Sequence, residues 1–271
     1  MECRPTDEIL SPLPQPFRSA LLSMYNVEPQ LGPDGERHPL DGHTLITPEQ
    51  GMWLYGLCRG MKPKATLEIG LAYGFSTTYF LAAIHENGAG HHTAIDPLQS
   101  RLWDGIGRQG PQNLGMGASF RFIEARSVSA LAQLADGGET FEVIFIDGNH
   151  RFDDVLVDFT LSARLCPVGG CLVLDDLWMS SIRRAVAFIR ANREDFEEIK
   201  TPVSHIAAFR RIHEDARAWH HFVDFFGPSD VVRAILRLEF FDTTDVLRKV
   251  IRHTPSSVRR VARAILRFAR P

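Results

Sequence analysis

Five apolar β-runs alternate with helical patterns through the middle of this chain, and this alternation limits its fold more than any other feature. The β-runs lie at 65–71, 91–96, 119–125, 141–147 and 170–176. Helical patterns occupy 75–86, 101–113, 127–136, 151–165 and 180–193, and shorter β-runs lie near 196–201 and 205–211. Strands separated by helices of about 10–15 residues indicate βαβ units. We therefore predict a Rossmann-like, doubly wound α/β fold with a mostly parallel seven-stranded sheet.

The chain divides into three parts by composition. Residues 1–45 are rich in Pro and Gly, with one short helix expected at 16–25. A clear helix start follows, with Thr47 as N-cap, Pro48 at the first helical position and Gln50 completing a capping box. We predict an α/β domain over 46–213 and a helical, Arg-rich extension over 214–271.

Composition indicates an ordinary globular protein. The chain is 44% hydrophobic and 23% charged with a net charge of −3, so it is not a general polyanion binder. Its four cysteines form no CxxC pair and lie in or beside apolar segments, as reduced core cysteines do. No signal peptide or apolar run long enough to span a bilayer is visible. We expect a cytoplasmic location.

The first two strands end in residues suited to an adenosine-containing cofactor. Gly70 and Gly74 flank a turn into a helix with Ser76 in its first turn, where free N–H groups and a missing Cβ admit a ligand. Asp96 ends the second strand, where an acid can accept hydrogen bonds from ribose hydroxyls. The Gly-x-x-x-Gly spacing disfavours a dinucleotide site. The alternative is a turn for close helix–strand packing.

The fourth and fifth strands end in acids. Asp147 follows one strand, and Asp175 and Asp176 follow the next. Adjacent strand ends lie about 5 Å apart, so these carboxylates would repel one another unless a cation neutralised them. Oxygen ligands favour Mg²⁺ or a similar ion. The alternative is that the acids cap the elements that follow.

His150 lies three residues beyond Asp147, beside this predicted metal site. An imidazole suits the role of general base toward an acceptor hydroxyl. The alternative is a surface histidine in a loop.

These motifs, in this order, resemble class I S-adenosylmethionine-dependent methyltransferases over about residues 45–212. Within that class they are most similar to the metal-dependent small-molecule O-methyltransferases of the catechol and caffeoyl-CoA types, nearest to the bacterial branch that includes the macrolide-sugar O-methyltransferases. The motifs that carry the resemblance are "LEIGLAYGFST", "AIDP", "FIEARSVSAL", "IDGNH" and "LVLDD".

The resemblance implies a role for each matched residue. It places cofactor binding on Glu68, Gly70, Gly74, Ser76, Asp96, Glu124, Ala125, Ser127 and Asp147, with Glu124, Ala125 and Ser127 near the adenine. It places the metal, Mg²⁺ or another divalent cation, on Asp147, Asp175 and Asp176, and the base on His150. It implies O-methylation of a small-molecule acceptor, a sugar or natural product, with residues 1–45 as a lid. Trp178 and Met179 would line the acceptor pocket or lie in the core.

The extension stays open to several interpretations. Residues 246–271 hold eight Lys and Arg and no acid, and a partly amphipathic helix there could contact an anionic membrane, a glycolipid or another subunit. We expect a homo-oligomer and no nucleic-acid partner. His220 and Asp224 have metal-compatible spacing, but an amphipathic helix packing on the core is the favoured interpretation. The alternative functions are metal-independent or N-methylation, a nucleotide-dependent oxidoreductase, and a non-catalytic scaffold.

Overall fold

The computed structural model describes residues 6–225, and most of the expected strands and helices are present there. The strands are β1 (Gln30–Leu31), β2 (Arg37–His38), β3 (Ala65–Ile69), β4 (His91–Ile95), β5 (Phe120–Ile123), β6 (Val143–Ile146), β7 (Cys171–Leu174), β8 (Phe196–Ile199) and β9 (Ala207–Arg211). The α-helices are α1 (Thr6–Ile9), α2 (Gln15–Tyr25), α3 (Pro48–Met61), α4 (Phe75–Asn87), α5 (Gln99–Leu102), α6 (Ile106–Asn113), α7 (Ser127–Asp136), α8 (Phe152–Leu165) and α9 (Ser180–Asn192), with a 3₁₀ turn at Gly117–Ser119.

A seven-stranded sheet, as predicted, forms the centre, in the order β5-β4-β3-β6-β7-β9-β8. Strands β3 to β7 run parallel, and β9 is antiparallel to both of its neighbours. The chain builds outward from β3 to β5 on one side and then returns to add β6 on the other. Strand order therefore reverses at β3, where an open α/β sheet binds its ligands beyond the carboxyl ends of the strands.

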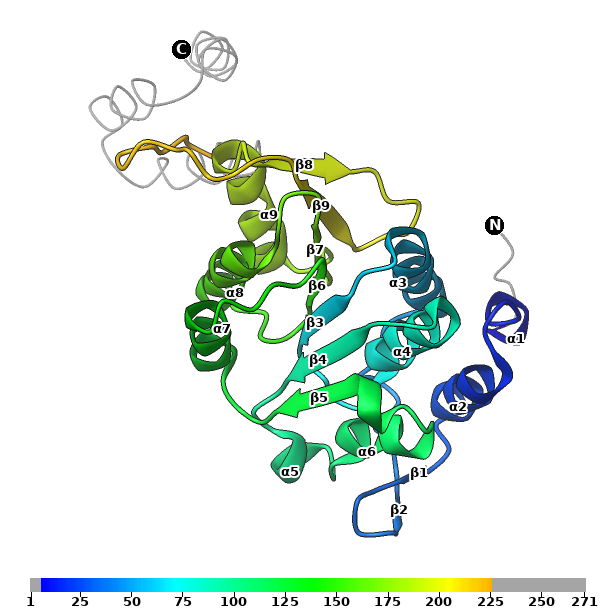
Figure 1. Cartoon of the computed structure of the whole chain (residues 1–271). Helices are drawn as coiled ribbons and strands as arrows, with labels where there is room; N and C mark the ends of the chain where they lie inside the picture. The colour runs from blue at the N-terminus through cyan, green and yellow to red at the C-terminus, as the bar shows by residue number, and fades with distance from the viewer. Residues whose placement is uncertain (1–5, 226–271) are drawn as a thin grey trace, which may run out of the picture. The chain divides into compact units, whose positions relative to one another are not determined.

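Helices cover both faces of this sheet (Figure 1), with α3 and α4 on one face and α7 and α8 on the other. Helix α4 is buried from Phe75 to Ile84 because α3 and α2 pack over it. Such a helix needs apolar or small residues on every side, which explains its weak amphipathic pattern. Helix α4 therefore lies in a middle layer, between the sheet on one side and α2 and α3 on the other.

The N-terminal region packs onto α4. Phe17, Leu21 and Met24 of α2 are buried in the same apolar cluster as α4. The hydroxyl groups of Tyr25 and Tyr79 lie 3.0 Å apart, and the Tyr25 hydroxyl also donates to the carbonyl of Ile46. These contacts hold α2 beside the start of α3. Whether residues 1–45 act as a lid stays a prediction.

Local structure differs from the sequence expectation in two places. The helix expected over 101–113 is two helices, α5 and α6, because Asp104 and Gly105 between them have φ of 48° and 67°, outside helical geometry. The β1–β2 hairpin was not expected, since strands of two residues are too short to show a periodic signal.

The extension is only partly described. The chain clusters into two compact units, and among the described residues the second includes Ala187–Arg193 and 217–225. Residues 214–225 contain no helix, so the amphipathic helix expected around His220 and Asp224 is wrong for that segment. Within the second unit, the Asn192 side chain instead binds both backbone groups of Val223. The Arg-rich segment 246–271 lies outside the described residues. Among residues 6–225, no helix has the length and apolar character needed to cross a bilayer.

We expect Gly51→Ala in α3 to destabilise the protein by about 1–3 kcal/mol, because overpacking a tight core forces side chains and backbone to shift. A Cβ at Gly51 would lie 2.1 Å from the Tyr79 ring. The matched control is Gly56→Ala in the same helix, where a Cβ meets nothing within 4 Å. That substitution should be neutral or stabilising by up to ~1 kcal/mol. Chemical denaturation of both variants measures the difference, and equal effects would contradict the packing argument.

Candidate active site

The loop from β3 to α4 depends on two glycines. Gly70 has a φ of 95°, and a Cβ there would lie 2.1 Å from the backbone oxygen of Asp147. Gly74 has a φ of 86° and precedes the first residue of α4. The close approach at Gly70 is therefore to the backbone of the neighbouring β6 end. This packing alone requires a residue without a Cβ at position 70, whether or not a ligand binds there.

Glu68 and Ser76, both predicted to bind the cofactor, contact each other beneath this loop. Glu68 is completely buried, and its carboxylate accepts hydrogen bonds from the hydroxyl groups of Ser76, at 2.9 Å, and Thr77. His92 Nε2 lies 3.5 Å from the same carboxylate. Glu68 thus fixes the first turn of α4 from inside the molecule.

The acids that follow β4 and β5 organise the neighbouring loops. One Asp96 oxygen accepts from the backbone N–H groups of Leu71, at 3.1 Å, and Ala72, at 2.9 Å. Glu124 accepts from the backbone and side chain of Ser100, both at 2.9 Å, and these bonds lower the pKa of Glu124. Asp96 therefore determines the shape of the glycine loop, whatever further contact it makes.

Ala125 and Ser127 complete the predicted cofactor residues. Ser127 is the first residue of α7, and its side chain donates to Asp158 of α8. Burial raises the pKa of Asp158 to about 6, and the bond from Ser127 opposes that rise. Because β3, β4 and β5 are parallel, the structure places the predicted cofactor residues along one edge of the sheet, at or just after the carboxyl ends of these strands.

Three of the predicted site residues come together at the ends of β6 and β7. Ile146 pairs with Leu174 across these parallel strands, so the acids that follow leave the sheet side by side. Single ligand atoms of Asp147, His150 and Asp176 all lie within 4.8 Å of one another. Two carboxylates and an imidazole at this separation form a donor set that fits a divalent cation.

His150 forms the centre of this group. Its Nε2 atom lies 2.8 Å from Asp176 and 3.6 Å from Asp147. These carboxylates raise the pKa of His150 to about 10, while burial raises the pKa of Asp147 to about 6. The charged imidazole therefore offsets one of the two negative charges at neutral pH, and the group of three keeps a net negative charge. A metal ion would compete with it for the same oxygens.

Asp175 does not join these three ligands, although the sequence suggested that all three acids converge. It is buried, and its Oδ1 accepts from Gln50 Nε2 at 2.8 Å and from the Asp176 N–H at 2.7 Å. Burial, then the nearby Asp147, raises the pKa of Asp175 to about 8. Sequence reasoning assigned Gln50 to a helix cap alone. Nothing in the spacing signals a contact over 125 positions.

The segment after the acids has an unusual backbone. Asp176 has a φ of 60°, a left-handed conformation that Asp tolerates better than most residues. The indole N–H of Trp178 donates to Asp176 at 2.7 Å, and Arg183 donates to the carbonyls of Leu177 and Trp178. Trp178 is 58% exposed, which excludes the core role considered from sequence. Its ring is available beside the acidic cluster.

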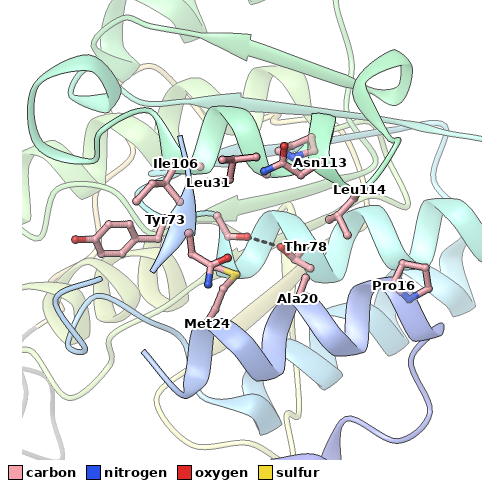
Figure 2. Close-up of a pocket in the computed structure, with 14 residues that line it drawn as sticks. Pro16, Ala20, Met24, Leu31, Tyr73, Thr78, Ile106, Asn113 and Leu114 are labelled. Atoms are coloured by element: carbon pink, nitrogen blue, oxygen red, sulfur yellow. Dashed lines mark hydrogen bonds between the residues drawn. The ribbon is translucent and has the colours of Figure 1, made fainter. Parts of the chain in front are cut away.

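A cavity of about 260 Å³ lies on another side of the glycine loop. Figure 2 shows Met24 and Ala20 of α2, Thr78 of α4, Ile106 of α6 and Leu114 just after α6 around it. None of the acids at the strand ends lines this space. The cavity therefore does not by itself locate the chemistry.

Comparison with known proteins agrees with this geometry. Residues 67–177 match the family described as a methyltransferase domain. A provisionally named O-methyltransferase of Mycobacterium sp. (strain JLS) is 31% identical over 134 residues, which cover 49% of this chain and 57% of that protein. Another, from Mycolicibacterium smegmatis, is 28% identical over 177 residues, covering 65% and 76%. The chain thus spans little more than half the length of the first of these relatives.

The solved O-methyltransferase TomG from Streptomyces achromogenes, involved in tomaymycin synthesis and bound to S-adenosylmethionine, has a similar fold. Its TM-score is 0.55 at 18% identity, over 74% of this chain and 91% of TomG. The sheet order, the glycine loop and the domain match agree: this part of the chain is similar to class I S-adenosylmethionine-dependent methyltransferases, and to O-methyltransferases among them.

Proposed function

We propose that this protein is an S-adenosylmethionine-dependent O-methyltransferase, assisted by a divalent cation, that acts on a hydroxyl group of a small polyhydroxy acceptor such as a sugar or natural product. The observation that carries the proposal is the group of Asp147, His150 and Asp176 at the strand ends. It adjoins the glycine loop, since Gly70 packs against the Asp147 backbone. A base and cation ligands therefore adjoin the segment expected to hold the methyl donor.

Each side chain at the strand ends has its own role in this proposal. Asp147 and Asp176 would hold the cation, while Asp175, the third ligand expected from the sequence, lies outside the group of ligand atoms. His150 Nε2 would accept the proton of the acceptor hydroxyl in its neutral form, which requires that a cation take the carboxylate oxygens that otherwise raise the pKa of His150 to about 10. When bound, the cofactor supplies an electrophilic methyl group and the cation supplies Lewis acidity toward the acceptor oxygen. Positioning the acceptor oxygen against the methyl group accounts for a large part of such catalysis.

A metal-independent methyltransferase is the principal alternative. His150 already offsets one of the two carboxylate charges through contacts of 2.8 and 3.6 Å, so the repulsion between the acids is partly relieved without an ion. N-methylation on the same fold and a non-catalytic scaffold are further alternatives. Retained cofactor binding with no turnover on any acceptor would favour the scaffold.

Location and partners belong to the same proposal. Cys58, Cys166 and Cys171 are free and buried, as expected in a reducing compartment, and we propose a cytoplasmic protein. A homo-oligomer, and contact of residues 246–271 with a membrane or glycolipid, are proposed from the sequence alone.

We expect Asp176→Asn to abolish Mg²⁺ binding while leaving binding of S-adenosylhomocysteine intact, because the substitution removes a charged oxygen from the donor set. Methyl transfer to small diols should fall by about 100-fold or more, as when a stabilising group is lost from an active site. Calorimetric titrations and a labelled-methyl assay measure the two effects.

The matched control is Asp153→Asn, an exposed acid in the first turn of α8, which should bind Mg²⁺ normally. If the wild-type protein binds the nucleoside and shows full activity in chelator, metal assistance is wrong and the metal-independent alternative stands.

His150→Ala should lower kcat by about 10²–10⁴-fold, the contribution typical of a general base. Affinity for S-adenosylhomocysteine should not change. Arg151→Ala, an exposed neighbour, serves as the control and should retain near-normal kcat. Steady-state kinetics with a diol acceptor measures both variants, and normal turnover by His150→Ala would remove His150 from the mechanism.

A further inference from the structure

Trp178 combines an exposed ring with a fixed position beside the acidic group at the strand ends. The residue is 58% exposed, and its indole N–H donates to Oδ1 of Asp176 at 2.7 Å. This bond ties one edge of the ring to the site and leaves much of the ring in contact with solvent. Binding sites for small molecules combine a few polar groups with apolar and aromatic side chains. Trp178 is an aromatic side chain placed next to such polar groups.

The backbone that carries Trp178 is also held in place. Arg183 donates to the carbonyl groups of Leu177, at 2.9 Å, and Trp178. In addition, the N–H of Leu177 donates to the carbonyl of His205 at 2.9 Å. Because the ring and its backbone are already ordered, a ligand that packs on the indole loses little free energy to ordering it.

The order of the strands places Trp178 away from the glycine loop. Strand β6 lies between β3 and β7 in the sheet. The glycine loop follows β3 and contacts the Asp147 backbone through Gly70, whereas Trp178 follows β7. Along this edge, Asp147 therefore comes between the loop expected to hold the methyl donor and the segment with Trp178. In a direct transfer the methyl group lies between donor and acceptor, so the acceptor extends away from the donor, toward Trp178.

A single carboxylate separates the imidazole from the indole. Oδ2 of Asp176 lies 2.8 Å from Nε2 of His150, and Oδ1 lies 2.7 Å from the indole nitrogen of Trp178. An acceptor that carries the reacting hydroxyl group on a ring therefore reaches the indole. A Trp side chain offers a large apolar face on which flat rings stack. An acyclic polyol has no flat face and gains little from this surface.

We propose that the Trp178 indole is the stacking surface of the acceptor site, and that it selects acceptors with neighbouring hydroxyl groups on an aromatic or sugar ring over acyclic polyols. The inference rests on the proposed function and narrows the acceptor class of the same site. Asp176 connects the two parts, because one of its oxygens faces His150 and the other orients the ring.

The test uses the full-length protein with saturating S-adenosylhomocysteine and Mg²⁺. Catechol, a ring with two neighbouring hydroxyl groups, is titrated by calorimetry, and ethylene glycol, the same pair of groups without a ring, competes against it. Trp178→Ala removes the ring, and Trp178→Phe keeps a flat ring without the N–H group. Trp219→Ala, which removes an indole that is 97% exposed, is the matched control. Thermal melts check that each variant is folded.

Trp178→Ala should raise the Kd for catechol by about 10-fold, as expected for a lost aromatic stack, with unchanged affinity for ethylene glycol and the nucleoside. Trp178→Phe should stay within about 3-fold of the wild type, because a ring face remains. Trp219→Ala should match the wild type. Equal loss in Trp178→Phe and Trp178→Ala would assign the effect to the bond with Asp176 and overturn the inference. Normal catechol binding by Trp178→Ala would overturn it too, as would a wild type that binds ethylene glycol as tightly as catechol.

The wild type alone separates this inference from the proposed function. If it binds the nucleoside and Mg²⁺ but no catechol, the stacking surface is wrong and the proposed function stands. If it does not bind the nucleoside, the proposed function fails and the inference falls with it.

Discussion

The parallel pairing of β6 with β7 is the constraint on which the site depends. Ile146 lies opposite Leu174, so the chain leaves both strands at the same level of the sheet, and each strand is followed at once by an acid. Because β3 is the other neighbour of β6, the glycine loop lies at the same edge. The sheet therefore brings like charges together next to the predicted cofactor loop, and the surrounding residues must compensate for their repulsion.

Several contacts provide this compensation, and they differ in kind. His150 contributes a positive charge to Asp147 and Asp176, and Trp178 donates an indole N–H to Asp176. Asp175 receives only neutral donors, which is consistent with its raised pKa. A divalent cation would add what neutral donors cannot, since it attracts several carboxylates at once. The carboxylates at the strand ends are therefore only partly compensated by the protein's own side chains.

Sequence patterns predicted most of the fold because the central strands β6 and β7 are continuous apolar runs and the helices between the parallel strands are of ordinary length. They failed where the signal was local and short. The turn at Asp104 and Gly105 divides a helix that periodicity had treated as one. The segment at 218–225 has helical spacing of apolar residues but no helix, since spacing alone does not form one, and the Val223 backbone bonds to the Asn192 side chain instead.

The order of strands and helices, the glycine turn and the residues that end each strand were determined by the sequence, since these features depend on neighbours along the chain. Which of the acids share a site was decided only by the tertiary structure. Glu68 is enclosed beneath α4, Asp175 turns toward Gln50, and Asp147 and Asp176 meet at His150. These differences depend on which side chains of other elements supply donors or positive charge, and two such partners, Gln50 for Asp175 and His150 for Asp176, come from distant parts of the sequence.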